Sequence, residues 1–242
     1  MRNTLAFGFL GAFLGAALLL PVVGSAAAPN VKGKIAGTDK LISEVYAEAA
    51  KPESRRWTWR EPAPSVAPQF RNLSASPSRD ICIAALRSDP AGQEAMRFTM
   101  NVTGGRVVPT TIVVPPNTQL SFKNVDPFKH RIFVVNQTTL KAEDLQPNGI
   151  RSWTAPGPGR YEVRDELFPS VRTYIVVDPQ VVQFVYPRDN AFSLSLPPGE
   201  YVLKAFFNGK AVGKPATGIT VKERSNIELK ETLNVGEGVE SK

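Results

Sequence analysis

Residues 111–135 constrain the fold more than any other part of the chain, because they follow the pattern of short β-strands closely spaced by turns. Leu120 and Phe122 alternate with polar residues, which is the period of a strand with one buried face. Asn117 stands in a proline-rich turn, and asparagine is among the few residues that tolerate a positive φ. Three strands are therefore predicted here, at 111–114, 119–123 and 131–135.

The motif after the second of these strands is Asn124-x-Asp126, followed by His130 and the third strand. This order resembles the cupredoxins, the blue-copper proteins, over residues 96–177. The resemblance implies a Greek-key β-sandwich. It also implies that His130 stands where that family has one of its copper ligands.

The composition argues against the rest of a copper site. A blue-copper centre needs two histidines, a cysteine thiolate and usually an axial methionine, and this chain has a single histidine. The positions that match the family's cysteine, second histidine and methionine hold Arg164, Leu167 and Ser170. We therefore expect no bound metal and no cofactor. One alternative stays open, a periplasmic copper-binding or electron-transfer protein in which His130 joins Met96 or Met100 in a copper(I) site.

A second β-unit follows residue 178. Residues 191–203 contain the run Leu196-Pro197-Pro198-Gly199-Glu200-Tyr201 between two apolar strands. This pattern resembles the carboxypeptidase-regulatory, transthyretin-like domains, whose opening strands resemble residues 31–47 here. The resemblance implies a smaller transthyretin-like or Ig-like β-sandwich, split in sequence by the cupredoxin-like domain.

The whole chain is accordingly predicted to be all-β, with regular short strands and frequent turn signals. Prolines are dense from Lys51 to Asp80, which predicts an extended linker. The predicted division is a signal peptide (1–27), the first transthyretin-like strands (30–50), the linker (51–80), the cupredoxin-like domain (81–178), the rest of the transthyretin-like domain (179–234) and a polar tail (235–242).

The N-terminal 28 residues have a basic start, a long apolar run and a small-residue segment, as in a bacterial secretory signal peptide. We expect export to the periplasm, the cell exterior or the outer-membrane surface, with cleavage after Ala27. An uncleaved segment, the alternative, would be the chain's contact with a membrane. The single cysteine, Cys82, rules out an internal disulfide and lies in an apolar run, which favours a buried thiol.

Two groups of residues are candidate partner-binding sites. The first gathers at the end of the sandwich where the family holds copper: Phe128, His130, Leu167 and Phe168. Exposed together they would form an interaction patch, and buried they would fill the space of the lost metal. The second is the basic and aromatic cluster Arg55, Arg56, Trp57, Trp59 and Arg60. Its residue types are frequent at binding hot spots and on sugars, although the tryptophans could equally fix the linker onto the sandwich.

Enzymatic activity is not expected. A Ser-His-Asp device would have to use the single histidine, and no serine lies in a nucleophile elbow. The acidic pairs Asp165-Glu166 and Glu143-Asp144 are predicted to be solvated surface charge. The formal charge of +7 is spread over the chain, which does not favour nucleic acid as a partner. The expected function is that of an accessory or structural subunit that binds a protein partner in a cell-envelope assembly, with copper binding and polysaccharide binding as alternatives.

Overall fold

The structure, a computed structural model, describes residues 30–44, 75–89 and 95–237. Regular structure in these residues is almost entirely β, so the predicted all-β class is confirmed. The helical pieces of this part of the chain are η1 (Thr38–Lys40) and α2 (Pro77–Asp80). At three and four residues they fall well short of the length needed to cross a bilayer.

The first sandwich packs two sheets around one core. One sheet has the order β12-β1-β15, with β16 also on β1: β12 (Ala191–Ser195), β1 (Asn30–Ala36), β15 (Asn226–Glu228) and β16 (Leu233–Asn234). The other has the order β11-β2-β13-β14: β11 (Val181–Val185), β2 (Ile81–Leu86), β13 (Gly199–Phe207) and β14 (Lys210–Val221). Val31, Leu194 and Leu203 are among the side chains buried between the sheets.

The second sandwich is built from the intervening residues. One sheet has the order β4-β3-β6-β8: β4 (Arg106–Val108), β3 (Arg97–Thr103), β6 (Gln119–Asn124) and β8 (Ile150–Thr154). The other has the order β5-β10-β9-β7: β5 (Thr111–Val114), β10 (Arg172–Val177), β9 (Gly159–Asp165) and β7 (Ile132–Val134). Leu120 and Phe122 of β6 point into the core, as the alternation predicts, and Asn117 has φ 63° in the turn before it.

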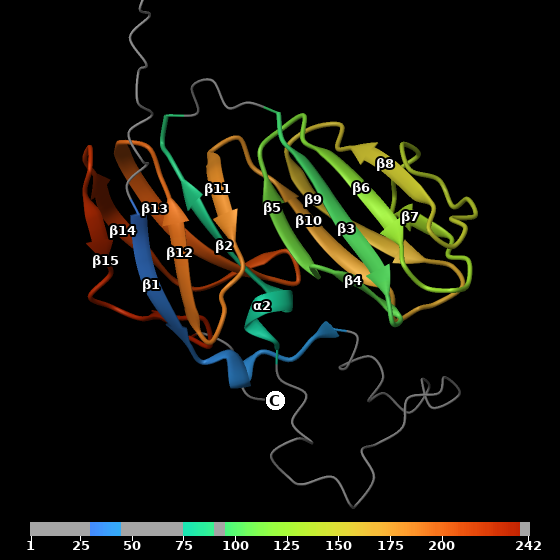
Figure 1. Cartoon of the computed structure of the whole chain (residues 1–242), viewed down its shortest axis with the longest axis horizontal. Coiled ribbons are helices and arrows are strands. Elements are labelled where there is room, and N and C mark those ends of the chain that lie inside the picture. Colours follow the sequence, from blue (N-terminus) through green and yellow to red (C-terminus); the bar gives the residue numbers. More distant parts are fainter. Residues whose placement is uncertain (1–29, 45–74, 90–94, 238–242) are drawn as a thin grey trace, which may run out of the picture.

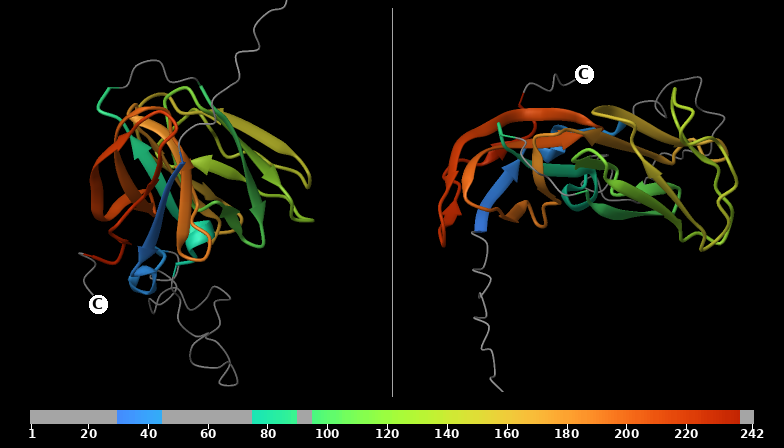
Figure 2. Two further views of the ribbon diagram at one scale, coloured as in Figure 1. Left: turned by 60° about the vertical axis from the view of Figure 1, so that its left-hand side comes forward. Right: turned by 90° about the horizontal axis from the view of Figure 1, so that it is seen from above.

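The two sandwiches lie side by side along the long axis of the molecule (Figures 1 and 2). They meet through β2, which is buried along its whole length. Ile81 and Ile83 face the first core, whereas Cys82 and Ala84 face the other way, against Val113 of β5. The short side chains of Cys82 and Ala84 allow the second sandwich to approach closely, and an unbroken apolar run is what a strand covered on both faces requires.

The position of β2 corrects the predicted domain boundary. Residues 81–86 were assigned to the cupredoxin-like domain, but β2 pairs with β11 and β13 of the first sandwich. An apolar run predicts that a strand is buried but does not indicate which sheet it joins. The predicted boundary at residue 81 was wrong for this reason. The strands that share a sandwich with β1 therefore come from residues 81–86 as well as from those after 180.

Two smaller predictions are also wrong. The first transthyretin-like strands were expected over 30–50, but residues 41–44 form none of the named strands. The tail from 235 was expected to be polar and frayed, but Val235 is fully buried in the first core because its backbone continues to pair with β1. Asn208 and Gly209 both have positive φ, as a tight hairpin requires, and this turn joins β13 to β14. The predicted signal peptide and most of the predicted linker lie outside the described residues.

Candidate functional site

The loop after β6 is shaped by the two polar residues of the Asn-x-Asp motif. The Asn124 amide donates to the carbonyl oxygens of Phe128 (2.8 Å) and Leu145 (3.0 Å), and its oxygen accepts from the Asp126 backbone N–H (2.9 Å). Asp126 in turn accepts from the backbone N–H of Gly104, at 2.9 Å. Because these bonds close the loop on itself, its last residue, His130, is held in a fixed place at the end of the sandwich.

His130 is completely buried and lies between two carboxylates. Its Nδ1 is 2.8 Å from Oδ2 of Asp165, and its Nε2 is 3.1 Å from Oδ2 of Asp126. Its backbone exchanges two hydrogen bonds with Leu145. The rings of Phe128 and Phe168 pack around the imidazole, with centroids 5.2 and 5.0 Å away.

The contacts of His130 need two protons. A carboxylate oxygen only accepts, so each short N···O contact is a hydrogen bond only if a proton lies in it. A neutral imidazole brings one such proton. The cluster is therefore fully hydrogen-bonded either as an imidazolium between two carboxylates or as a neutral imidazole beside one protonated carboxyl group.

Asp165 is the centre of this cluster, and its predicted role was wrong. It was expected to be solvated surface charge, but its side chain is wholly buried. Besides His130, its oxygens accept from the backbone N–H groups of Arg131 (3.2 Å), Leu167 (2.7 Å) and Phe168 (3.1 Å). Sequence reasoning missed this residue because its histidine partner lies 35 positions away and no local pattern links the two.

These residues do not fit a blue-copper site. Both ring nitrogens of His130 already face carboxylates, so a metal would have to displace one of them. Cys82 lies in the other sandwich, where burial raises the pKa of its thiol to about 12. Met100 is buried in the second core, and Met96 is half-buried before β3. Within the described ranges, no group of three or more histidine, cysteine, aspartate or glutamate side chains is arranged to hold a metal ion.

The four residues of the first predicted patch lie around this cluster but differ in exposure. Phe168 is half-buried and its ring covers His130, whereas Phe128 is 41% exposed and Leu167 39% exposed. The rings of Phe128 and Phe168 are 4.9 Å apart. The space beside His130 is therefore filled by Phe168, while Phe128 and Leu167 face solvent.

Further apolar side chains are exposed at the same end. Val125 follows β6, and Ile150 begins β8 beside the end of β6. The described part of the chain has five exposed large hydrophobic side chains, and the four at this end are Val125, Phe128, Ile150 and Leu167. We refer to these four residues as the apolar end.

Charged side chains border the apolar end. Asp144 accepts hydrogen bonds from Lys129 and Arg131, each at 2.8 Å, and Arg131 also lies 3.4 Å from Glu166. The bonds from Lys129 and then Arg131 lower the pKa of Asp144, which keeps its carboxylate charged. The result is an apolar surface with a charged rim.

Arg164 and Ser170 make hydrogen bonds within the second sandwich. Arg164 donates to Glu162 at 2.7 Å, and the Ser170 hydroxyl donates to the Gly105 carbonyl at 2.9 Å. The second predicted cluster, Arg55, Arg56, Trp57, Trp59 and Arg60, lies outside the described residues.

No protein-family model matches the chain, and no curated protein matches it. Solved structures similar to part of it are copper proteins. Amicyanin from Paracoccus versutus is 12% identical, with a TM-score of 0.32, over 40% of this chain and 97% of that one. A copper(I) amicyanin variant is 16% identical, with a TM-score of 0.31, over 35% and 82%. The copper-containing nitrite reductase of Thermus scotoductus SA-01 is 21% identical, with a TM-score of 0.31, over 35% of this chain and 23% of that one. Likenesses this weak carry no argument about what the chain does.

Proposed function

We propose that the chain is an exported, non-enzymatic β-sandwich protein that serves as an accessory or structural subunit of a cell-envelope assembly. The apolar end is its contact surface for a protein partner. The observation that carries this proposal is the gathering of exposed hydrophobic side chains at one end, four of the five in the described residues. Exposed apolar side chains gathered in one region with a polar border are typical of protein–protein interfaces.

The buried cluster supports this function by fixing the surface. Asp165 holds the backbone of Leu167 and Phe168, and its contact with His130 ties that loop to the one that carries Phe128. A surface that is ordered before binding loses less conformational freedom on association, which favours affinity. His130 acts here as a structural residue, with both ring nitrogens engaged inside the protein.

The test is site-specific photo-cross-linking in cells that express the chain naturally. A photoreactive phenylalanine analogue at position 128 should give one dominant adduct with an envelope protein, and the double variant Phe128→Ser/Leu167→Ser should no longer co-purify with that protein. Ile42→Ser is the control, because Ile42 is even more exposed than Phe128 and Leu167 but lies after η1, away from the apolar end. It should retain the partner.

Two results would contradict the proposal. One is the same set of adducts from a probe at position 42 as from a probe at position 128. The other is full co-purification of the partner with the double variant. An adduct with a second copy of the chain would instead make the apolar end a self-association surface, and the proposed envelope partner would be withdrawn.

A further inference from the structure

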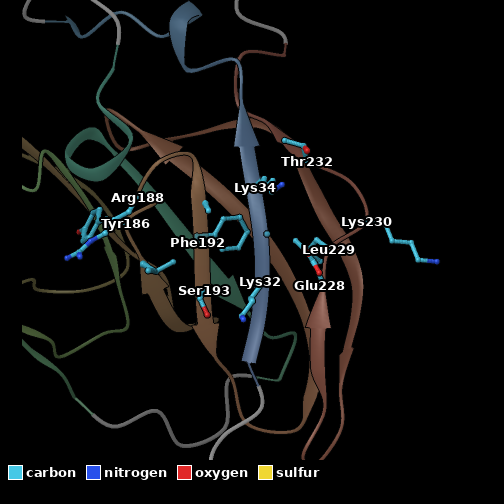
Figure 3. Close-up of a pocket in the computed structure, with 13 residues that line it drawn as sticks. Lys32, Lys34, Tyr186, Arg188, Phe192, Ser193, Glu228, Leu229, Lys230 and Thr232 are labelled. Carbon is cyan, nitrogen blue, oxygen red and sulfur yellow. The ribbon is translucent and has the colours of Figure 1, made fainter.

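The first sandwich contains a cavity of about 710 Å³ over β1, on the sheet β12-β1-β15. It arises from an interruption in pairing. β15 pairs with residues 30–32 of β1 and β16 with residues 35 and 36, so residues 33 and 34 have no partner strand on that side. The chain between β15 and β16 bulges away there. In Figure 3, β1 crosses the cavity, with Tyr186 and Arg188 on the β12 side and Leu229 and Lys230 on the other.

Two apolar side chains pack beneath Gly33, on the core side of β1. A Cβ atom at Gly33 would lie 2.8 Å from Cε1 of Phe192 and 2.9 Å from Cδ1 of Leu229, so these two side chains occupy the space that any other residue would need. Phe192 and Leu229 both line the cavity. Both side chains belong to the core of the first sandwich, whereas Lys32 and Lys34 are exposed on the opposite face of β1.

The walls carry an excess of positive charge. Four cationic side chains line the cavity, together with one carboxylate, Glu228; the cations are Lys32, Lys34, Arg188 and Lys230. All four are exposed, and in the described ranges none of their side chains has an ion pair or a hydrogen bond. Elsewhere cations such as Arg131 and Arg151 are paired with acidic side chains. An unpaired group of cations around a hollow favours an anionic ligand.

We infer that this cavity binds an acidic oligosaccharide, a short chain of sugars that carry carboxylates. The cations stand on both sides of β1, so they suit several separated negative charges better than one. The volume lies within the range of about 300–1,000 Å³ that is usual for ligand sites.

Glu228 distinguishes this ligand from a phosphate polymer. A carboxylate in the wall accepts hydrogen bonds from sugar hydroxyls, which are donors. A phosphate polymer offers no such donor, so the same carboxylate can only repel it. The hydroxyls of Ser193 and Thr232, which also line the cavity, add groups that suit a polyhydroxylated ligand.

The experiment is calorimetric titration of the full-length exported protein at low ionic strength with hexagalacturonate, maltohexaose and inorganic polyphosphate. Hexagalacturonate should bind at one site, and its affinity should fall as salt is added. The affinities for maltohexaose and polyphosphate should be lower than that for hexagalacturonate by at least about tenfold. Lys32→Ala/Lys34→Ala should lower the affinity for hexagalacturonate by about tenfold or more, because hydrogen bonds to charged groups are the stronger ones.

The matched control is Lys123→Ala/Lys141→Ala, which removes the same charge from exposed, unpaired lysines of the second sandwich. The affinity of this control variant for hexagalacturonate should stay within about twofold of the wild-type value. Equal losses of affinity for hexagalacturonate in the two double variants would show binding to net charge alone and would overturn the inference. Polyphosphate binding as tight as that of hexagalacturonate, or tighter, would also overturn it, and so would the absence of saturable hexagalacturonate binding. The cross-linking at the apolar end is independent of every one of these outcomes.

Discussion

Replacing Asp165 by alanine should destabilise the second sandwich more than any other single loss of a carboxylate in the described residues. The substitution removes four acceptor contacts at once, those with His130 Nδ1 and with the backbone N–H groups of Arg131, Leu167 and Phe168. A buried donor left without an acceptor costs about 1–3 kcal/mol. Some of the four donors will regain water because three of their residues, Arg131, Leu167 and Phe168, are partly exposed. The expected loss is therefore about 3–5 kcal/mol, as for other broken buried ion pairs.

Urea unfolding followed by circular dichroism measures the total effect, and hydrogen exchange of the segments 125–135 and 165–171 shows where it falls. Asp165→Asn keeps one acceptor oxygen, so its free energy of unfolding should lie between those of Asp165→Ala and the wild type. Asp144→Ala is the control: it removes two hydrogen bonds of similar length from an exposed carboxylate, where solvent screens the charges. The reasoning is refuted if Asp165→Ala unfolds at the same urea concentration as Asp144→Ala, or if exchange in the two segments is unchanged.

Three further predictions concern the contact between the two sandwiches. Burial raises the pKa of the Cys82 thiol from 9.0 to about 12, so the native protein should not react with a disulfide reagent at pH 8 but should react fully in urea. Above pH 9 the unfolded chain releases a proton that the folded thiol keeps, so the free energy of unfolding should fall as the pH rises further. Tyr174→Phe removes the hydroxyl that donates to Glu44 at 2.8 Å and should cost about 1 kcal/mol in urea unfolding, whereas an unchanged midpoint would show that this bond adds nothing. Gly209→Ala should cost about 1–3 kcal/mol, because φ is 69° and the new Cβ would lie 2.8 Å from Arg160 Nε and Tyr174 Cβ; calorimetry that shows no loss would refute this.

Local features of the fold could be predicted from the sequence because each is decided within a few residues. The alternation of Leu120 and Phe122 identifies the buried face of β6, and a positive φ is available to Asn117 whatever surrounds it. The Asn208-Gly209 turn is local in the same sense. The all-β class follows from the repetition of such patterns along the chain.

Features that depend on distant residues could not be predicted in this way. The run from Ile81 to Leu86 requires burial on both faces, but the identity of the covering sheets depends on contacts with β11, β13 and β5, far along the chain. For the same reason, nothing around Asp165 indicates that its carboxylate turns inward to His130. The cavity over β1 was missed because it depends on where β15 stops pairing and β16 resumes.

The single histidine of this chain has a use that does not depend on a metal. Without hydrogen-bond partners, the buried imidazole of His130 would have two unsatisfied nitrogens, which would destabilise the folded state. Asp126 and Asp165 remove that cost. Asp126 also accepts from the backbone N–H of Gly104, and Asp165 accepts from that of Arg131, so both carboxylates bind other segments of the chain. The imidazole thus connects three loops at one end of the second sandwich, and their exposed residues Phe128 and Leu167 gain fixed positions from it. The two aspartates that engage both ring nitrogens of His130 therefore also order the loops around it.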